Sequence, residues 1–335
     1  MKSLITDGQN RFELTETAEL AISPDEVLVA PIMTGVCGTD LEIIDGKIDP
    51  AFVNYPIVLG HEWTGRVIKV GSNVQSIEVG SRVVAEGIIP CGICFECIEG
   101  STNRCTTYDE VGFTRPGAAA EQISVRADLL HAIANSVTDE SATLVEPAAV
   151  VTQGLMKADP KKGSKVLIIG DGTIALIAAK LVRNWQPSEV HMLGLKKGQS
   201  PLAEQAGVDL FMINPSPEKY DLIIDASGAS SRISESIRQL VRGGRLLLLG
   251  FTGPDVSTPI SIDDLVNGDL SVFASFGYSR AAWKETVELM NCGKLDLTFL
   301  VTHRFPLENF QDAIEALRSA PAPRGKVIID LLPQI

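Results

Sequence analysis

Apolar runs that alternate with helix-forming stretches between residues 165 and 249 constrain the fold of this chain most. Lys165–Ile169 (KVLII) is almost wholly apolar and is followed by Gly170, as expected for a strand buried on both faces of a parallel sheet. The alternation continues through helices predicted at 173–184, 202–206 and 233–241 and strands predicted at 189–193, 222–225 and 245–249. This pattern predicts βαβ units and a doubly wound Rossmann sheet.

The flanking segments are β-rich, which predicts a second domain. Short β-prone runs at 26–30, 65–70 and 82–85 are separated by Gly, Pro, Ser and Asn, and the chain ends in a strand predicted at 326–332. We therefore expect an α/β protein in which a discontinuous catalytic domain (1–149 and 283–335) is interrupted by a Rossmann dinucleotide-binding domain (150–282). The active site is expected in the cleft between the two domains.

Length and charge narrow the class of partner. A chain of 335 residues suits two domains. Its net charge of −13, from 29 basic and 42 acidic residues, argues against a nucleic acid or an anionic membrane as partner, since both favour a basic face. The first residues soon turn polar, and no run approaches the roughly 18 apolar residues that span a bilayer. We expect a cytoplasmic protein that acts on a small molecule.

Four of the six cysteines form one cluster, Cys91-x2-Cys94-x2-Cys97-x7-Cys105. In a long chain without an export signal, this spacing predicts metal binding rather than disulfides. Four thiolates close a tetrahedral shell around zinc and leave no open position, which is typical of a structural site. An iron–sulfur cluster is the main alternative, because its ligands use similar spacing.

A second, sparser set of residues predicts a catalytic zinc. Cys37, His61 and Glu146 supply sulfur, nitrogen and oxygen donors, and Glu62 lies beside His61 as a carboxylate that can bind or withdraw. A catalytic zinc takes about three protein ligands and keeps one position for substrate oxygen, whose proton it acidifies. Thr39, two residues after Cys37, is predicted to relay that proton; otherwise its hydroxyl satisfies local backbone.

A glycine-rich turn follows the first strand of the predicted Rossmann domain. It reads Gly170-Asp171-Gly172-Thr173-Ile174-Ala175, a GxGxxA pattern between a buried strand and a helix. Glycines permit a tight turn and close approach of the backbone, and the N-terminus of the helix attracts a pyrophosphate. We predict a dinucleotide site here, although the Asp171 carboxylate is an uncomfortable neighbour for a diphosphate.

The residues after the second predicted strand favour NADP over NAD. An NAD site usually carries an acidic residue about 20 positions after the glycine-rich turn, where it binds the ribose. Here Gly194 is followed by Leu195, Lys196 and Lys197, so the acid is absent and two cations are present. A small residue followed by cations suits a 2′-phosphate. The alternative is that the lysines belong to a solvated turn.

Five segments together resemble the zinc-containing medium-chain dehydrogenase/reductase superfamily: GVCGTD, YPIVLGHEWTG, CGICFECIEGSTNRC, VEPAAV and VLIIGDGTIAL. They occur in order over nearly the whole chain. The resemblance implies a GroES-like fold for the catalytic domain and the roles given above for both zinc sites. Glu146-Pro147 is similar to the polyol and threonine dehydrogenase branch. The resemblance also implies a homodimer or homotetramer, and further cofactor contacts at Ser227, Gly250, Phe251, Ser275 and Lys326.

The resemblance also bears on the substrate. The stretch from Cys37 to Lys47 is similar to glucose dehydrogenases, and Glu42 is there a candidate acceptor for sugar hydroxyls. GHEW and the segment that ends at Arg115 resemble dehydrogenases of cyclitols and aminocyclitols, and Arg115 is a candidate contact for a substrate phosphate or acid. Both residues are equally compatible with a solvated surface. The expected function is oxidation of a secondary alcohol of a sugar, polyol or (amino)cyclitol.

Two alternatives remain open at this point. One is an NAD-dependent secondary-alcohol or L-threonine dehydrogenase. The other, from a different class, is a non-catalytic structural or binding member of the same fold. The presence of all three candidate ligands and of the Thr39 hydroxyl argues against the second alternative.

Overall fold

A computed structural model describes residues 1–253 and 255–331. The chain forms two compact units. The first comprises Met1–Glu146, Ser279–Ala320 and the chain from Lys326 onward, and the second comprises Pro147–Tyr278 and Pro321–Gly325. The unit limits therefore fall at 146/147 and 278/279, where the sequence predicted 149/150 and 282/283. Residues 321–325 join the second unit, which the sequence did not predict.

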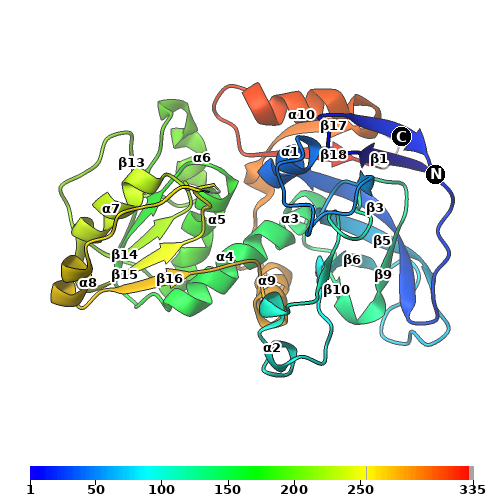
Figure 1. Cartoon of the computed structure of the whole chain (residues 1–335), viewed down its shortest axis with the longest axis horizontal. Coiled ribbons are helices and arrows are strands. Elements are labelled where there is room, and N and C mark those ends of the chain that lie inside the picture. Colours follow the sequence, from blue (N-terminus) through cyan, green and yellow to red (C-terminus); the bar gives the residue numbers. More distant parts are fainter. Residues whose placement is uncertain (254, 332–335) are drawn as a thin grey trace. The chain divides into compact units, whose positions relative to one another are not determined.

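The second unit is built on six parallel strands in the order β13-β12-β11-β14-β15-β16. In chain order they are β11 (Lys165–Ile169), β12 (Glu189–Leu193), β13 (Leu210–Met212), β14 (Tyr220–Asp225), β15 (Leu240–Leu248) and β16 (Ser271–Ala274). The connecting helices are α5 (Thr173–Val182), α6 (Ser200–Gln205), α7 (Ser230–Gln239) and α8 (Ile262–Gly268). The predicted α/β class with a doubly wound parallel sheet is confirmed (Figure 1).

Burial explains which elements of the second unit could be predicted from the sequence. In β11, Val166, Leu167, Ile168 and Ile169 are all buried, so the strand carries a continuous apolar run. The strand β13 has only three residues, none fully buried, and α8 (IDDLVNG) has no buried residue. Neither element was predicted, because an exposed or half-exposed short element leaves little hydrophobic periodicity.

The described residues of the first unit form three sheets. The largest has the order β10-β6-β5-β3-β18-β17, with β9 also paired to β3; a second has the order β2-β1-β4; and β7 pairs with β8. The strands are β1 (Lys2–Thr6), β2 (Phe12–Glu16), β3 (Glu26–Val36), β4 (Ile57–Val58), β5 (Glu62–Val70), β6 (Arg82–Ala85), β7 (Ile88–Ile89), β8 (Asp109–Glu110), β9 (Ile123–Arg126), β10 (Leu130–Ala132), β17 (Val301–Pro306) and β18 (Lys326–Asp330).

The long strand β3 ends directly before Cys37, one of the predicted zinc ligands. The sequence predicted a strand only over 26–30, and the next residue, Pro31, has no N–H to donate to a ladder. The strand continues to Val36, and its register to β5 shifts between Pro31 and Met33. A bulge of this kind accommodates the proline within a paired strand. The predicted last strand, 326–332, ends at Asp330, and residue 332 lies outside the described residues.

The described part of the first unit has short helices at α1 (Gly38–Ile44), α2 (Phe95–Ile98) and α3 (Asp139–Thr143). Its longer helices are α9 (Arg280–Asn291) and α10 (Phe310–Ser319), and α4 (Val145–Ala158) begins at the boundary of the unit. The helix α10 was not predicted, although Phe310, Ala313 and Ile314 follow a helical spacing and are buried. They belong to the same core cluster as Val36 and Val327 of the neighbouring strands.

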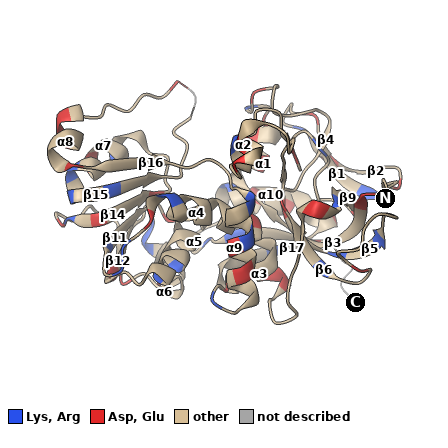
Figure 2. Cartoon of the chain, turned by 90° about the horizontal axis from the view of Figure 1, so that it is seen from below, with Lys and Arg blue, Asp and Glu red and all other residues tan. Residues whose placement is uncertain are grey.

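Figure 2 shows acidic and basic residues interspersed over the helices and strands of each unit. Within residues 1–253 and 255–331, no helix is long and apolar enough to cross a bilayer.

Candidate active site

Three of the predicted catalytic ligands lie together in the first unit. The ligand atoms of Cys37, His61 and Glu62 are within 4.8 Å of one another. They meet because β3 and β5 are antiparallel neighbours, with Gly35 opposite Glu62; Cys37 directly follows β3, and His61 directly precedes β5. A Cβ atom at position 35 would overlap Glu62 Oε2, so glycine there allows this position of the carboxylate.

Asp40, which sequence reading had not singled out, orients two of these ligands. Its side chain is buried; Oδ2 accepts the backbone N–H of Cys37 at 2.8 Å, and Oδ1 lies 3.4 Å from His61 Nδ1. This contact leaves Nε2 of His61 available to a metal. Burial lowers the pKa of His61, but the Asp40 carboxylate and the Cys37 thiol outweigh burial and raise it well above its usual value. Asp40 could have been found from the sequence, because it lies three residues after the predicted ligand Cys37 in the segment CGTD.

A buried ion pair joins Glu62 to Lys326 at the start of β18. Nζ of Lys326 donates to Glu62 Oε1 at 2.6 Å and also contacts Oε2. Both side chains are at most 4% exposed. Burial opposes the charge of Lys326, but Glu62 and Cys37 raise its pKa above the usual value. Sequence reasoning assigned Lys326 to a cofactor pyrophosphate; in the structure the partner of its ammonium is Glu62.

Two further carboxyl groups lie in the electrostatic field of this site. Burial raises the pKa of Glu146, at the start of α4, to about 8; His61 opposes the shift, and Glu62 and Glu110 add to it. Burial likewise raises the pKa of Glu110 to about 7, with His61 opposing. Glu146 does not belong to the group of ligand atoms within 4.8 Å, and Glu110 was not predicted at all.

The donor set fits a zinc ion. A thiol, an imidazole and a carboxylate are the ligands that zinc takes in catalytic sites. Burial raises the pKa values of Glu110 and Glu146, and a divalent cation beside them would favour their charged forms. The residues present therefore fit the metal.

The other predicted residues of this site lie on α1 and on the loop after β8. Thr39 Oγ1 lies 3.7 Å from Cys37 Sγ, so the predicted relay hydroxyl is adjacent to the ligand cysteine. Glu42 is exposed on α1. Arg115 is exposed and forms an ion pair with Asp109, with Nε and the terminal nitrogen at 2.9 and 2.8 Å from the carboxylate. Its charge is thus already partnered within the loop.

The four clustered cysteines also meet. Their sulfur atoms lie within 4.8 Å of one another, and all four are free thiols. Cys94 Sγ is 3.4 Å from Cys97 Sγ, and the Cys91 N–H points at Cys105 Sγ at 3.4 Å. The four cysteines therefore come together as their spacing predicted, in a group that is able to hold a metal ion. A closed shell of this kind fits a structural zinc.

The glycine-rich turn joins β11 to α5 in the second unit. Gly170 has φ +115°, and a Cβ there would lie 3.2 Å from the backbone of Ala226. Gly172 is the N-cap of α5, and a Cβ there would meet nothing within 4 Å, so the space over the turn is open. This cradle beside a helix N-terminus fits a dinucleotide pyrophosphate. Thr173 and Ile174 form the first turn of α5.

The remaining predicted cofactor residues lie at the carboxyl ends of β12, β14, β15 and β16. Gly194 follows β12, and Lys196 and Lys197 are exposed beyond it. Ser227 donates to Asp225 after β14; Gly250 packs so closely on Gly228 that a Cβ would overlap its nitrogen; and Ser275 Oγ is buried without a hydrogen-bond partner among the described residues. Phe251 is 82% exposed. Their contacts with a dinucleotide stay predictions.

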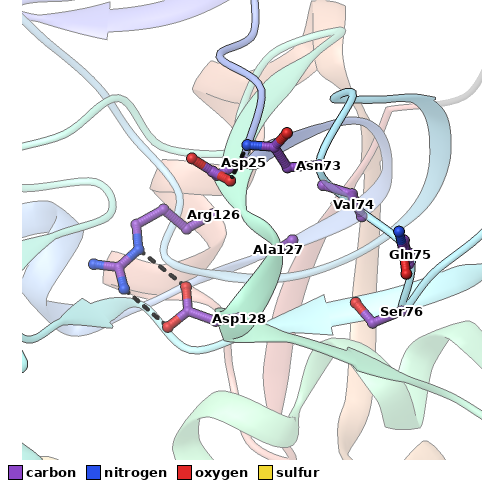
Figure 3. Close-up of a pocket in the computed structure, with 8 residues that line it drawn as sticks. All are labelled: Asp25, Asn73, Val74, Gln75, Ser76, Arg126, Ala127 and Asp128. Atoms are coloured by element: carbon purple, nitrogen blue, oxygen red, sulfur yellow. Dashed lines mark hydrogen bonds and ion pairs between the residues drawn. The ribbon is translucent and has the colours of Figure 1, made fainter.

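A separate surface pocket of about 560 Å³ lies in the first unit (Figure 3). Its polar groups are largely satisfied by one another: Asn73 donates to Asp25 at 2.9 Å, and Arg126 binds Asp128 through two nitrogens. None of the predicted site residues lines it. The pocket therefore does not compete with the Cys37–His61–Glu62 group as a candidate active site.

Two family models match the chain. The model described as "Alcohol dehydrogenase GroES-like domain" matches residues 23–135, and the model described as "Zinc-binding dehydrogenase" matches residues 205–329. Together they cover more than half of the sequence. The chain belongs to the zinc-containing medium-chain dehydrogenase/reductase superfamily. The predicted family, its fold and the class of enzyme, a zinc-dependent dehydrogenase, are thereby confirmed.

Curated relatives of the chain include polyol and amino-acid dehydrogenases. D-arabinitol dehydrogenase 1 of Uromyces fabae is 30% identical over 334 residues, which is 95% of this chain and 94% of the relative. The L-threonine 3-dehydrogenase of Yersinia pestis (strain Pestoides F) is 28% identical over 330 residues, covering 94% and 95% of the two chains.

Two similar solved structures contain a nicotinamide dinucleotide, NADP in one and NADH in the other. A zinc-binding dehydrogenase of Sinorhizobium meliloti 1021, bound to NADP, is 25% identical with a TM-score of 0.92 and covers 98% of each chain. An alcohol dehydrogenase of Escherichia coli CFT073, complexed with NADH, is 26% identical with a TM-score of 0.91 and covers 98% and 99% of the two chains.

Proposed function

We propose that this dehydrogenase transfers a hydride between a secondary alcohol of a sugar, polyol or (amino)cyclitol and a nicotinamide dinucleotide. The observation that carries the proposal is the convergence of Cys37, His61 and Glu62 in one unit. The cradle at Gly170 and Gly172 in the other unit supports a dinucleotide as the second reactant.

The catalytic metal is zinc, held by Cys37 and His61 with Glu62 or Glu146 as the carboxylate ligand. When bound, the zinc ion supplies a Lewis acid that polarises the substrate oxygen. The residues of the chain do the rest: Asp40 holds His61 and the Cys37 backbone in place, and Lys326 holds Glu62. The Thr39 hydroxyl would accept the proton of the substrate alcohol while its own proton passes to water.

A polyhydroxylated substrate is favoured by two features. Glu42 is exposed on α1, close in sequence to Cys37, and its carboxylate can accept hydrogen bonds from hydroxyl groups. One relative that matches nearly the whole chain is D-arabinitol dehydrogenase 1, and D-arabinitol is a polyol. The similarity to L-threonine 3-dehydrogenase supports the alternative, an NAD-dependent secondary-alcohol or threonine dehydrogenase. Arg115 contributes less to this proposal, because Asp109 already partners it.

The form of the dinucleotide has arguments on both sides. Exposed Lys196 and Lys197 beyond β12 favour the predicted NADP, whereas Asp171 places a carboxylate at the same end of that strand, which disfavours a 2′-phosphate.

The second metal is a structural zinc, bound by Cys91, Cys94, Cys97 and Cys105. The alternative is an iron–sulfur cluster, which would give the purified protein a brown colour and a measurable iron content.

We also propose a homodimer or homotetramer that forms through the edge of the Rossmann sheet. The strand β16 is an edge strand, and the apolar side chains of Val272 and Phe276 in and after it are exposed. Ile262 and Val266 of α8 are also exposed. Exposed apolar side chains at a sheet edge are typical of surfaces that associate. Light scattering measures the mass, and a Val272→Lys variant should shift it toward the monomer. The cytoplasmic location stays a prediction.

One experiment tests the proposal. The purified protein is analysed for zinc and iron, and initial rates are measured with both dinucleotides over polyols, aminocyclitols, L-threonine and short alcohols. Two zinc ions per chain and turnover of polyols support the proposal. Activity only on threonine or short alcohols supports the alternative, and metal confined to the cysteine cluster with no turnover supports a non-catalytic member. Cys37→Ser should abolish turnover and remove one zinc, while the exposed Cys292→Ser serves as the matched control.

A further inference from the structure

The side chain of Asp171 leaves the glycine-rich turn and reaches the end of the neighbouring strand β12. Its Oδ2 atom accepts the backbone N–H of Leu195 at 2.7 Å and that of Lys196 at 3.1 Å. Gln199, which is buried, donates from Nε2 to the Asp171 carbonyl at 2.8 Å. Both the backbone and the carboxylate of Asp171 are therefore fixed in position before any ligand binds.

This arrangement gives a second reason for the glycine at position 194. A Cβ on Gly194 would lie 2.5 Å from Phe211 Cζ and 2.8 Å from Asp171 Oδ2. The space that a larger residue would occupy is filled by an aromatic ring and by a carboxylate from the neighbouring turn. A small residue here is thus required by packing and does not by itself indicate room for a 2′-phosphate.

The end of β12 is where a Rossmann domain recognises the adenosine ribose. With the pyrophosphate at the N-terminus of α5, an acidic side chain at the end of the second strand normally binds the 2′-hydroxyl in NAD sites. Here that side chain is missing after β12, but the Asp171 carboxylate occupies the same end of the strand. Its Oδ2 atom is taken by two amides, and Oδ1 has no hydrogen-bond partner among the described residues, so Oδ1 is available to a hydroxyl.

We infer that Asp171 is the ribose-recognition carboxylate and that it makes NAD the preferred dinucleotide. The 2′-hydroxyl of NAD donates to Oδ1, whereas the 2′-phosphate of NADP meets a fixed negative charge and finds the backbone amides of Leu195 and Lys196 already bound. The inference rests on the proposed use of a nicotinamide dinucleotide. It reverses the preference predicted from Gly194, Lys196 and Lys197, whose ammonium groups then only moderate the discrimination.

Dissociation constants of NADH and NADPH, measured by fluorescence titration without any turnover, test the inference. The wild-type protein should bind NADH at least about tenfold more tightly than NADPH, as expected for a fixed carboxylate at the ribose. Asp171→Asn keeps the size of the side chain and an acceptor for the two amides but removes the charge. It should shift the ratio of the two constants toward NADPH by about tenfold.

Asp221→Asn is the matched control. Asp221 is exposed in the same unit, and its Oδ2 also accepts a backbone N–H, that of Lys165, at the opposite end of the sheet. This variant should leave both constants unchanged, and thermal unfolding shows whether either variant is folded.

Tighter binding of NADPH by the wild-type protein overturns the inference without use of any variant. So does an unchanged ratio in a folded Asp171→Asn protein, and in both cases the proposed function stands. If neither dinucleotide binds the wild-type protein, the proposed function itself is wrong.

Discussion

The buried pair of Lys326 and Glu62 makes a quantitative prediction about stability. Lys326→Met removes the ammonium and keeps much of the side-chain volume, so that the Glu62 carboxylate loses its partner inside the protein. The two charged atoms are 2.6 Å apart, and the side chains are 4% and 1% exposed. At an effective dielectric constant of about 20, unit charges at this distance attract by about 6 kcal/mol.

Desolvation of both ions offsets part of that attraction, so the expected loss on removing one partner is smaller. Breaking a buried pair typically costs about 3–5 kcal/mol of unfolding free energy. We expect a loss in this range for Lys326→Met in the metal-free protein. The double variant Lys326→Met with Glu62→Gln leaves no uncompensated charge, so it should be clearly more stable than Lys326→Met alone.

The assay is urea unfolding of chelator-treated protein, followed by tryptophan fluorescence in a Trp185→Phe background. The remaining tryptophans, Trp63 and Trp283, are buried in the first unit, so the signal reports that unit. Lys2→Met is the matched control: Lys2 pairs with Glu308 at 2.9 Å on the surface of the same unit, and its loss should change stability little. A Lys326→Met loss below about 1 kcal/mol, or a double variant no more stable than Lys326→Met alone, would refute the reasoning.

Three further predictions concern the metal sites. Asp40→Asn should weaken zinc binding at Cys37 and His61 by about 10- to 100-fold, since the carboxylate orients both ligands; competition with a chromogenic chelator measures the affinity, and an unchanged affinity would contradict the assigned role. Gly35→Ala should displace the Glu62 carboxylate and cost about 1–3 kcal/mol of stability, with a loss of turnover. Gly80→Ala, strained by the positive φ of 91° at that position but with open space around the Cβ, should cost stability without a loss of turnover. Cys97→Ser should release one zinc and increase proteolysis within residues 91–105, while the other zinc is retained; loss of both metals would contradict two independent sites.

Much of the candidate site was predictable because its signals are local. The cysteine spacing alone predicted a four-thiol group, and the sulfur atoms do meet within 4.8 Å. The strands β11 and β12 were predicted with their observed limits, because β11 is an apolar run and because Gly170 and Gly194 directly follow the two strands. Cys37 and His61 were recognised from the short motifs around them, which fold into the strand ends of β3 and β5.

Other parts were not predictable, since they depend on which segments become neighbours. Glu110 follows no motif, and only the pairing of β8 with β7 and the packing of its loop bring it into the field of His61. The α10 helix has a helical spacing of apolar residues, yet it ends after ten residues between proline-containing segments, so its pattern was too short to be decisive.

By itself, the sequence predicted the fold class, the four-cysteine group and the glycine-rich turn. These follow from periodicity and spacing within stretches of a few to twenty residues, where chain connectivity limits what the side chains can do. Only the tertiary structure decided the partners of the charged groups. Lys326 and Glu62 are 264 residues apart in the chain, and Asp171 reaches amides 24 and 25 residues further on. Burial makes such long-range partners necessary, because a charge removed from water is stable only beside a specific counter-charge or donor, and the sequence does not reveal which one the fold brings there.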